Sequence, residues 1–121
     1  MLPIREQVYN ALETHDIDLR REFDPKEVVD DISRKFGISS MDMKFIIEHE
    51  GGWPGKECRQ SDIIDKKGKR ENSWGPYQIN LDHNPRITKE QACDFIWASE
   101  WTAKQLSENR FYLWTSIKNQ N

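Results

Sequence analysis

The sequence predicts a mainly α-helical domain that carries one small, irregular β-hairpin region. Four segments place apolar residues at helical spacing, and residues suited to capping or to a first turn stand at their starts. Between residues 53 and 80 this spacing gives way to short pieces separated by glycines. Five Trp, five Phe and three Tyr among 121 residues supply large side chains for one core, so we expect a single domain over residues 1–121.

Two of the predicted helices lie within the first forty residues. Residues 3–14 form the first, because apolar residues recur there at helical spacing behind a proline suited to a first turn. The second begins after Asp24 as N-cap, has Pro25 in its first turn and ends at Gly37, since glycine tolerates the left-handed backbone of a C-terminal cap. We expect residues 1–40 to form a helical extension of the domain.

The third predicted helix runs from about Met41 to Glu50. Ser39 or Ser40 caps its start, and the glycine pair at 51–52 ends it.

A fourth predicted helix begins at Thr88, whose hydroxyl caps the helix while the side chain of Gln91 reaches back to it. Its apolar positions continue to Leu106, and we expect the tail at residues 110–118 to pack back on it.

Glu50 continues the apolar stripe of the third helix. It follows Met43, Ile46 and Ile47 at helical spacing, so its carboxyl group faces the core, whereas Glu48 points roughly the opposite way. Partial desolvation and the negative end of the helix dipole both favour the protonated form of such an acid. General acid catalysis on a glycosidic oxygen requires a carboxyl group of this kind. The alternative interpretation is that Glu50 marks the exposed end of the stripe.

Composition excludes several classes of function. With 18 Lys plus Arg against 21 Asp plus Glu, the formal charge of -3 gives no overall attraction to nucleic acid or anionic lipid. No apolar run approaches the length of a membrane span, and no signal peptide is visible in the first thirty residues. Cys58 and Cys93 lack CxxC spacing, so they allow one disulfide or two thiols and argue against a cysteine-based zinc site. We expect no metal and no cofactor.

Residues 72–80 read NSWGPYQIN and follow Glu50 after a glycine-rich loop. The features come in the order of a helix that ends in an acid, glycines, a loop and an S-x-G-x-x-Q-I-N motif. This order resembles that of the lysozyme-like superfamily. The resemblance is to the soluble lytic transglycosylases and related muramidases, which cleave peptidoglycan. It covers about residues 41–117, and residues 1–40 carry no such resemblance. The sequence departs from the family at Gly51, where serine is usual, and at Pro76-Tyr77, where an apolar pair is more common.

This resemblance implies a lysozyme-like helical domain with a substrate site beside Glu50. Hydroxyl and amide groups suit the hydroxyl and N-acetyl groups of a glycan, and aromatic rings can stack on sugar faces or pack in the core. Trp53, outside the motif, is one candidate for stacking on a sugar face. Gly75 allows the backbone to turn tightly under a sugar. The expected substrate-binding residues are Ser73, Trp74, Tyr77, Gln78 and Asn80.

The mechanism depends on a second carboxylate. Animal-type lysozymes carry an aspartate just before this motif, but here residues 72–74 are Asn-Ser-Trp. With Glu50 alone, the resemblance implies the transglycosylase scheme, in which Glu50 protonates the leaving oxygen and the substrate's N-acetyl group supports the cation at C1. Glu50, now a base, then takes the proton of the C6 hydroxyl as that oxygen bonds to C1 and closes a 1,6-anhydro ring. If Asp62 or Asp65 supplied the missing carboxylate, hydrolysis would be restored.

Three other functions are compatible with parts of the sequence. Residues 28–49 also fit a helix-turn-helix, but Asp42, Glu48 and Glu50 against the single Lys44 would repel DNA phosphates. The stretch HEGGW lacks the second histidine of an H-E-x-x-H zinc site. A glycan-binding module without catalysis is the third. We therefore expect a monomer that acts on peptidoglycan glycan strands, with no nucleic-acid partner and no membrane insertion. It would act at the bacterial cell wall, either in the periplasm, outside the cell or after release of the phage type.

Overall fold

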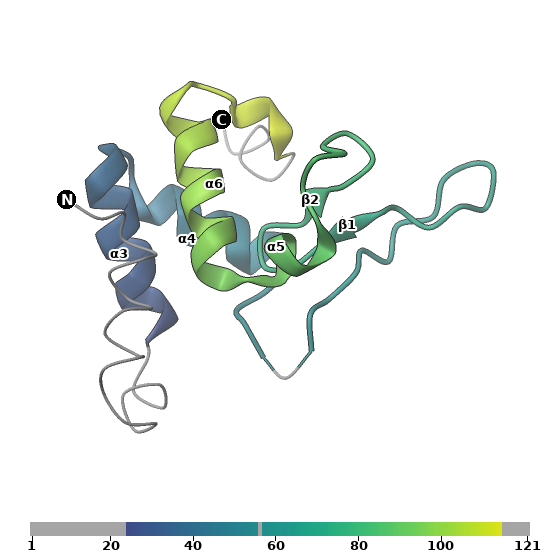
Figure 1. Cartoon of the computed structure of the whole chain (residues 1–121), viewed down its shortest axis with the longest axis horizontal. Helices are drawn as coiled ribbons and strands as arrows, with labels where there is room; N and C mark the ends of the chain where they lie inside the picture. The colour runs from purple at the N-terminus through teal and green to yellow at the C-terminus, as the bar shows by residue number, and fades with distance from the viewer. Residues whose placement is uncertain (1–23, 56, 115–121) are drawn as a thin grey trace.

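The computed structural model describes residues 24–55 and 57–114, and this part of the chain is mainly helical (Figure 1). The predicted helix at residues 3–14 lies outside it. Two strands form a small antiparallel sheet to one side of the helices, β1 (Ser73–Trp74) and β2 (Ile79–Asn80). The helices are α3 (Pro25–Phe36), α4 (Ser40–His49), α5 (Lys89–Cys93), α6 (Phe95–Ser107) and the short 3-10 helix η1 (Phe111–Leu113).

Helix α3 has the bounds that the sequence predicts. The carboxylate of Asp24 accepts a hydrogen bond from the Lys26 amide at 2.9 Å, Pro25 is the first helical residue, and Gly37 ends the helix with φ 69°. The helix packs against α4 and α6. Its inward face gives Val29 and Ile32 to the core, so α3 is packed together with the segment that resembles the family.

Helix α4 begins as predicted and ends one residue early. Ser39, rather than Ser40, caps it, because the Ser39 hydroxyl accepts from the Asp42 amide at 3.3 Å. The last helical residue is His49, so Glu50 is the C-cap, and Gly52 follows with φ 81°. Glu50 is therefore the residue at which the chain leaves the helix.

The prediction of one continuous helix from Thr88 is wrong, because the chain breaks at Asp94. The predicted capping box is confirmed, with Thr88 and Gln91 exchanging side-chain to backbone hydrogen bonds of 3.1 and 3.0 Å. Asp94, however, has an extended backbone with ψ 110°, and its carboxylate accepts from the amides of Ile96 and Trp97, both at 3.1 Å. An aspartate that caps a new helix in this way ends the previous one.

The predicted irregular hairpin region between residues 53 and 80 is confirmed. Ser73 pairs with Asn80 and Trp74 with Ile79 in the antiparallel sheet. Before β1, the segment from residue 60 to residue 71 forms an arm that extends away from the helices (Figure 1). An isolated bridge between Ile64 and Arg70 joins the two sides of this arm.

The C-terminal segment packs back on α6, as predicted, up to residue 114. Trp114 is buried, its indole nitrogen donates to the Tyr77 carbonyl at 2.8 Å, and its ring meets Trp101 of α6 edge-on with centroids 5.9 Å apart. The remainder of the predicted tail, residues 115–118, lies outside the described residues.

Cys58 and Cys93 form a disulfide, which decides between the two possibilities left open by the sequence. The bond ties the loop before the arm to the end of α5. In the part of the chain that the structure describes, no helix combines the length and apolar character that crossing a membrane requires.

Candidate functional site

A groove of about 570 Å³ lies where the end of α4, the hairpin and the C-terminal segment meet. Hydroxyl, amide and carboxyl groups share its lining with aromatic and aliphatic side chains. Four of the residues predicted for the site belong to it, Glu50, Ser73, Gln78 and Asn80. The other lining residues are Ile63, Glu71, Ile79, His83, Asn84, Trp101, Leu113 and Trp114.

Backbone hydrogen bonds hold Glu50 at the edge of this groove. Its own amide donates to the Ile46 carbonyl at 2.8 Å, which keeps the residue in the last turn of α4. The next amide, that of Gly51, donates to the Pro76 carbonyl at 3.1 Å and so joins the end of α4 to the turn of the NSWGPYQIN segment. The Glu50 side chain is half-buried. Gly51 and Pro76 lie 25 positions apart in the sequence, and their backbones therefore meet at the residue that follows Glu50.

Two glycines make this close approach possible. A Cβ atom on Gly51 would overlap the carbonyl oxygen of Gly75 and the carbonyl group of Pro76. Gly75 has φ 82°, and a Cβ atom there would overlap the carbonyl oxygen of Ala92 in α5. The departure from the family pattern at Gly51 thus has a physical reason in this chain, because backbone occupies the space that a serine side chain would need.

Ser73, Gln78 and Asn80 line the groove and also brace it. The Ser73 hydroxyl donates to Glu71 Oε1 at 2.7 Å. Gln78, whose φ is 51°, donates from its side-chain amide to the Gly75 carbonyl at 3.0 Å. Asn80 accepts at Oδ1 from the two amides that follow it at residues 82 and 83, at 2.9 and 3.0 Å. Ser73 is therefore held by Glu71, and Gln78 and Asn80 are held by the turns before and after β2.

Trp74 and Tyr77 do not line the groove; Tyr77 is buried, which corrects its predicted substrate contact, whereas the predicted contact of the half-buried Trp74 stays a prediction. The Trp74 indole nitrogen donates to Asn72 Oδ1 at 2.8 Å, and the ammonium group of Lys89 lies 4.3 Å from the centroid of the ring. Tyr77 is fully buried, and its hydroxyl is hydrogen-bonded to Ser99 Oγ at 2.7 Å. Burial raises the pKa of the Tyr77 hydroxyl well above its ordinary value. Both side chains serve packing in this structure.

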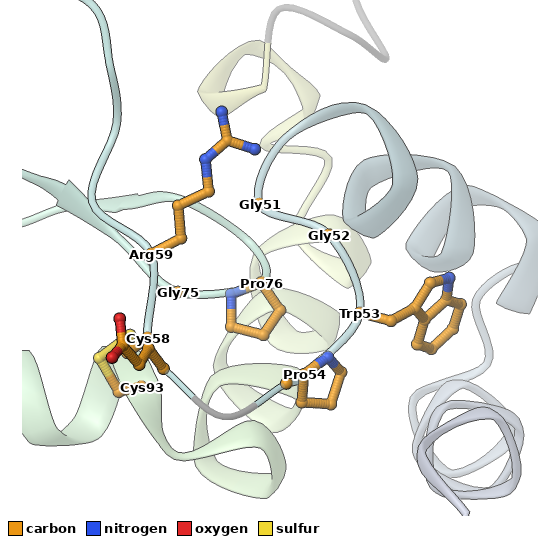
Figure 2. A pocket seen from close by; sticks show the side chains of 11 residues that line it. Gly51, Gly52, Trp53, Pro54, Cys58, Arg59, Gly75, Pro76 and Cys93 are labelled. Atoms are coloured by element: carbon orange, nitrogen blue, oxygen red, sulfur yellow. A yellow bond between two sulfur atoms is a disulfide. The ribbon is translucent and has the colours of Figure 1, made fainter.

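Trp53 also lies away from the groove, beside a smaller pocket of about 200 Å³ (Figure 2). This pocket shares no lining residue with the groove. The Cys58–Cys93 disulfide and Pro76 border it, and Figure 2 shows the Trp53 ring pointing away from them. The ring packs against Phe95 instead, with centroids 6.4 Å apart.

Asp62 and Asp65, the alternative sources of a second carboxylate, are on the exposed arm, outside the groove lining. Asp62 pairs with Arg59 at 3.0 Å and with Arg70 at 3.4 Å. Asp65 accepts from the backbone amides of residues 67 and 69 and shapes the tip of the arm. These contacts give Asp62 and Asp65 roles in the arm itself.

The carboxylate that the sequence analysis missed is Glu71. It lines the groove two residues before Ser73, and its side chain is half-buried. The signal was present in the sequence, because alternate residues of an extended segment share one face, so Glu71 and Ser73 are expected on the same side. Trp101 was missed as well, and its place on α6 gave no local signal that it would reach the groove.

The groove offers no ready metal centre. Among the described residues, no three His, Cys, Asp or Glu side chains gather in a way that would hold a metal ion. The groove lining itself supplies carboxyl, hydroxyl, amide and imidazole groups.

Comparisons of this chain with protein-family models, with curated proteins and with solved structures find no match. The function is therefore inferred from the geometry of the groove and from the two sequence segments that form it.

Proposed function

We propose that the protein cleaves the β-1,4 bond between N-acetylmuramic acid and N-acetylglucosamine in peptidoglycan glycan strands. In this proposal Glu50 donates the proton to the leaving oxygen. The observation that carries the proposal is the position of Glu50, a half-buried residue that lines one groove together with Ser73 and Gln78. The resemblance of the two sequence segments to lysozyme-like enzymes supports the same assignment.

The lining of the groove suits a glycan. A sugar ring presents hydroxyl and N-acetyl groups at its edge and aliphatic C–H groups on its faces. Amide side chains of Asn80 and Asn84 lie in the groove beside the half-buried ring of Trp101 and the exposed side chains of Ile63 and Leu113. A mixed lining of this kind matches both parts of the ring.

The first chemical step is the same for a hydrolase and for a transglycosylase. Glu50 transfers its proton to the glycosidic oxygen as the bond between that oxygen and C1 breaks, and positive charge develops at C1. The sequence favours the transglycosylase outcome because the motif itself carries no second carboxylate. Since Glu71 lines the groove, that reason no longer holds, and the product depends on what Glu71 does.

Binding of nucleic acid by α3 and α4 is less well supported. The exposed positions of α4 include Glu48, and Lys44 is engaged with Asp30 at 2.8 Å. The hydrogen bond and the charge of Lys44 hold the pKa of Asp30 below its usual range, as expected for a formed ion pair. A helix with this charge pattern would repel phosphate.

The test compares Glu50→Gln with the unaltered protein on purified peptidoglycan, with release of soluble muropeptides followed by mass spectrometry. Loss of the proton donor should lower the rate by about 10² to 10⁴-fold. Glu48→Gln is the matched control, because Glu48 lies two residues away, is exposed and does not line the groove, and it should retain full activity.

Equal rates for Glu50→Gln and the unaltered protein would overturn the assignment of Glu50. Binding of peptidoglycan without any cleavage would identify a glycan-binding module instead. Salt-sensitive binding of DNA with no cleavage would favour the helix-turn-helix interpretation.

A further inference from the structure

We propose that Glu71 is a second catalytic carboxylate of the groove, so that cleavage proceeds as a hydrolysis. This inference rests on the proposed function, because it assigns a role in the reaction that Glu50 begins. It starts from one observation. Of the groove-lining residues that the structure describes, Glu50 and Glu71 are the two with carboxyl groups, and they come from different elements, the end of α4 and the base of the arm.

Two serine hydroxyls orient the Glu71 carboxylate. Ser73 Oγ donates to Oε1 at 2.7 Å, and Ser61 Oγ donates to Oε2 at 3.3 Å. Both serines are buried, with exposures of 1% and 5%. Ser61 Oγ also accepts from the Ile63 amide at 3.1 Å, which leaves its own proton to point at Glu71. Each carboxylate oxygen therefore has a hydroxyl partner of its own.

The backbone of Glu71 is held as firmly as its side chain. Its amide donates to the Ile63 carbonyl at 2.7 Å, and its carbonyl accepts from the Gln60 side chain at 3.2 Å. These bonds cross the base of the arm, next to the first residue of β1. A catalytic group has to be held within a fraction of an ångström, and residues fixed in this way by the scaffold meet that need.

The other acids near the groove are occupied by structural contacts. Asp82 is exposed, accepts from the Asn72 side chain at 3.1 Å and lies 3.5 Å from the ammonium group of Lys69. The hydrogen bond from Asn72, followed by the charge of Lys69, keeps the pKa of Asp82 below its usual range. Asp82 does not line the groove, so Glu71 is the carboxylate placed to meet a glycan there.

The proposed step balances as the addition of one water molecule across the glycosidic bond. Glu50 gives its proton to the leaving oxygen while the bond from that oxygen to C1 breaks. Water forms the new bond to C1, and Glu71 takes the proton that this water loses. Both carboxyl groups then return to their starting states by exchanging protons with solvent.

The first experiment analyses products in water enriched in ¹⁸O. Hydrolysis by the unaltered protein should give reducing-end muramic acid that carries the label at C1. Glu71→Gln keeps the size of the side chain and a carbonyl oxygen for Ser73, yet it should lower the rate by about 10² to 10⁴-fold. Glu48→Gln is again the control, and thermal unfolding checks that each variant is folded.

The second experiment separates a catalytic role from a structural one. Glu71→Ala is assayed with added sodium azide, a small anion that fits the space left by the carboxylate. If Glu71 acts on the nucleophile, azide should restore cleavage and appear in the product as a glycosyl azide bonded at C1. A side chain that only supports the fold would not be replaced by azide.

Three results would overturn the inference while leaving the proposed function in place. The first is the release of 1,6-anhydro products by the unaltered protein. The second is a cleavage rate of Glu71→Gln within about 3-fold of the rate of the unaltered protein. The third is a Glu71→Ala variant that is folded and slow but forms no glycosyl azide. Each of them is compatible with loss of cleavage in Glu50→Gln. If the unaltered protein releases no muropeptides at all, the proposed function fails and this inference fails with it.

Discussion

Individual residues of the NSWGPYQIN segment have opposite roles, although they are neighbours in the sequence. Ser73 and Gln78 line the groove, whereas Tyr77 is buried against Ser99 and packs with Phe95, their ring centroids 6.2 Å apart. Between these residues the chain turns, with positive φ angles at Gly75 and Gln78. Tyr77 therefore contributes to stability.

Tyr77→Phe should lower the free energy of unfolding at pH 7 by about 1–2 kcal/mol, because the change leaves the buried Ser99 hydroxyl without its tyrosine partner. Chemical denaturation measures this loss. Burial raises the folded-state pKa of Tyr77 above its ordinary 10.0, so its contribution to stability is complete below pH 10 and is lost as the pH rises further.

The variant should accordingly lose less stability than the unaltered protein between pH 9 and pH 11, since the other tyrosines titrate in both proteins. If the free energy of unfolding depended on pH identically in the variant and the unaltered protein, the Tyr77 hydroxyl would not be buried in solution.

At the scale of elements, the contact between the end of α4 and the turn before β2 positions the acid. The Gly51 amide bonds to the Pro76 carbonyl at 3.1 Å, and no side chain separates the two backbones. A second close contact, between Gly75 and Ala92, sets the turn against α5. The groove is therefore held by direct backbone packing at two places, and both depend on the absence of a Cβ atom.

Gly51→Ala should destabilise the protein by about 1–3 kcal/mol, because the added methyl group would overlap the backbone of Gly75 and Pro76. Displacement of the end of α4 should also reduce cleavage by shifting Glu50. Gly55→Ala is the matched control, since a Cβ atom there meets nothing within 4 Å, and its stability should change by less than about 0.5 kcal/mol.

Thermal unfolding and the muropeptide assay measure the two effects. Equal stability of the two alanine variants would contradict the close approach at Gly51.

At the scale of the whole molecule, one disulfide joins segments that the helices do not connect. Cys58 and Cys93 are 35 positions apart, and their bond links the loop after α4 to the end of α5, on the pocket side shown in Figure 2. The hydrophobic core includes Ala92, the residue before Cys93 in α5. The disulfide therefore ties the loop at Cys58 to an element that packs in the core.

Replacing both cysteines by serine should cost about 3–4 kcal/mol, the loop-closure entropy expected for a closed loop of this length. Thermal unfolding with and without a reducing agent measures the loss. The reductant should lower the midpoint of the unaltered protein and leave that of the double variant unchanged. An unchanged midpoint after complete reduction, verified by thiol titration, would contradict the prediction.

Local sequence was sufficient for most helix boundaries. Asp24, Ser39 and Thr88 cap their helices through hydrogen bonds that span two or three residues, and Gly37 ends α3 with a backbone conformation that glycine favours. The break at Asp94 was the exception. Apolar residues on both sides of it kept a helical spacing, and periodicity does not register a single residue that caps a new helix.

The sequence by itself determined the helical character of the chain, most of its capping residues and the choice of Glu50 as the acid to consider, because these depend on contacts within a few residues. Tertiary structure alone decided that Trp101 reaches the groove and that Tyr77 is buried away from it, and it placed the face that Glu71 shares with Ser73 in the groove. Those outcomes depend on which distant segments pack together, above all on the two glycine contacts that bring α4, the turn and α5 within backbone distance. No local pattern encodes such an approach.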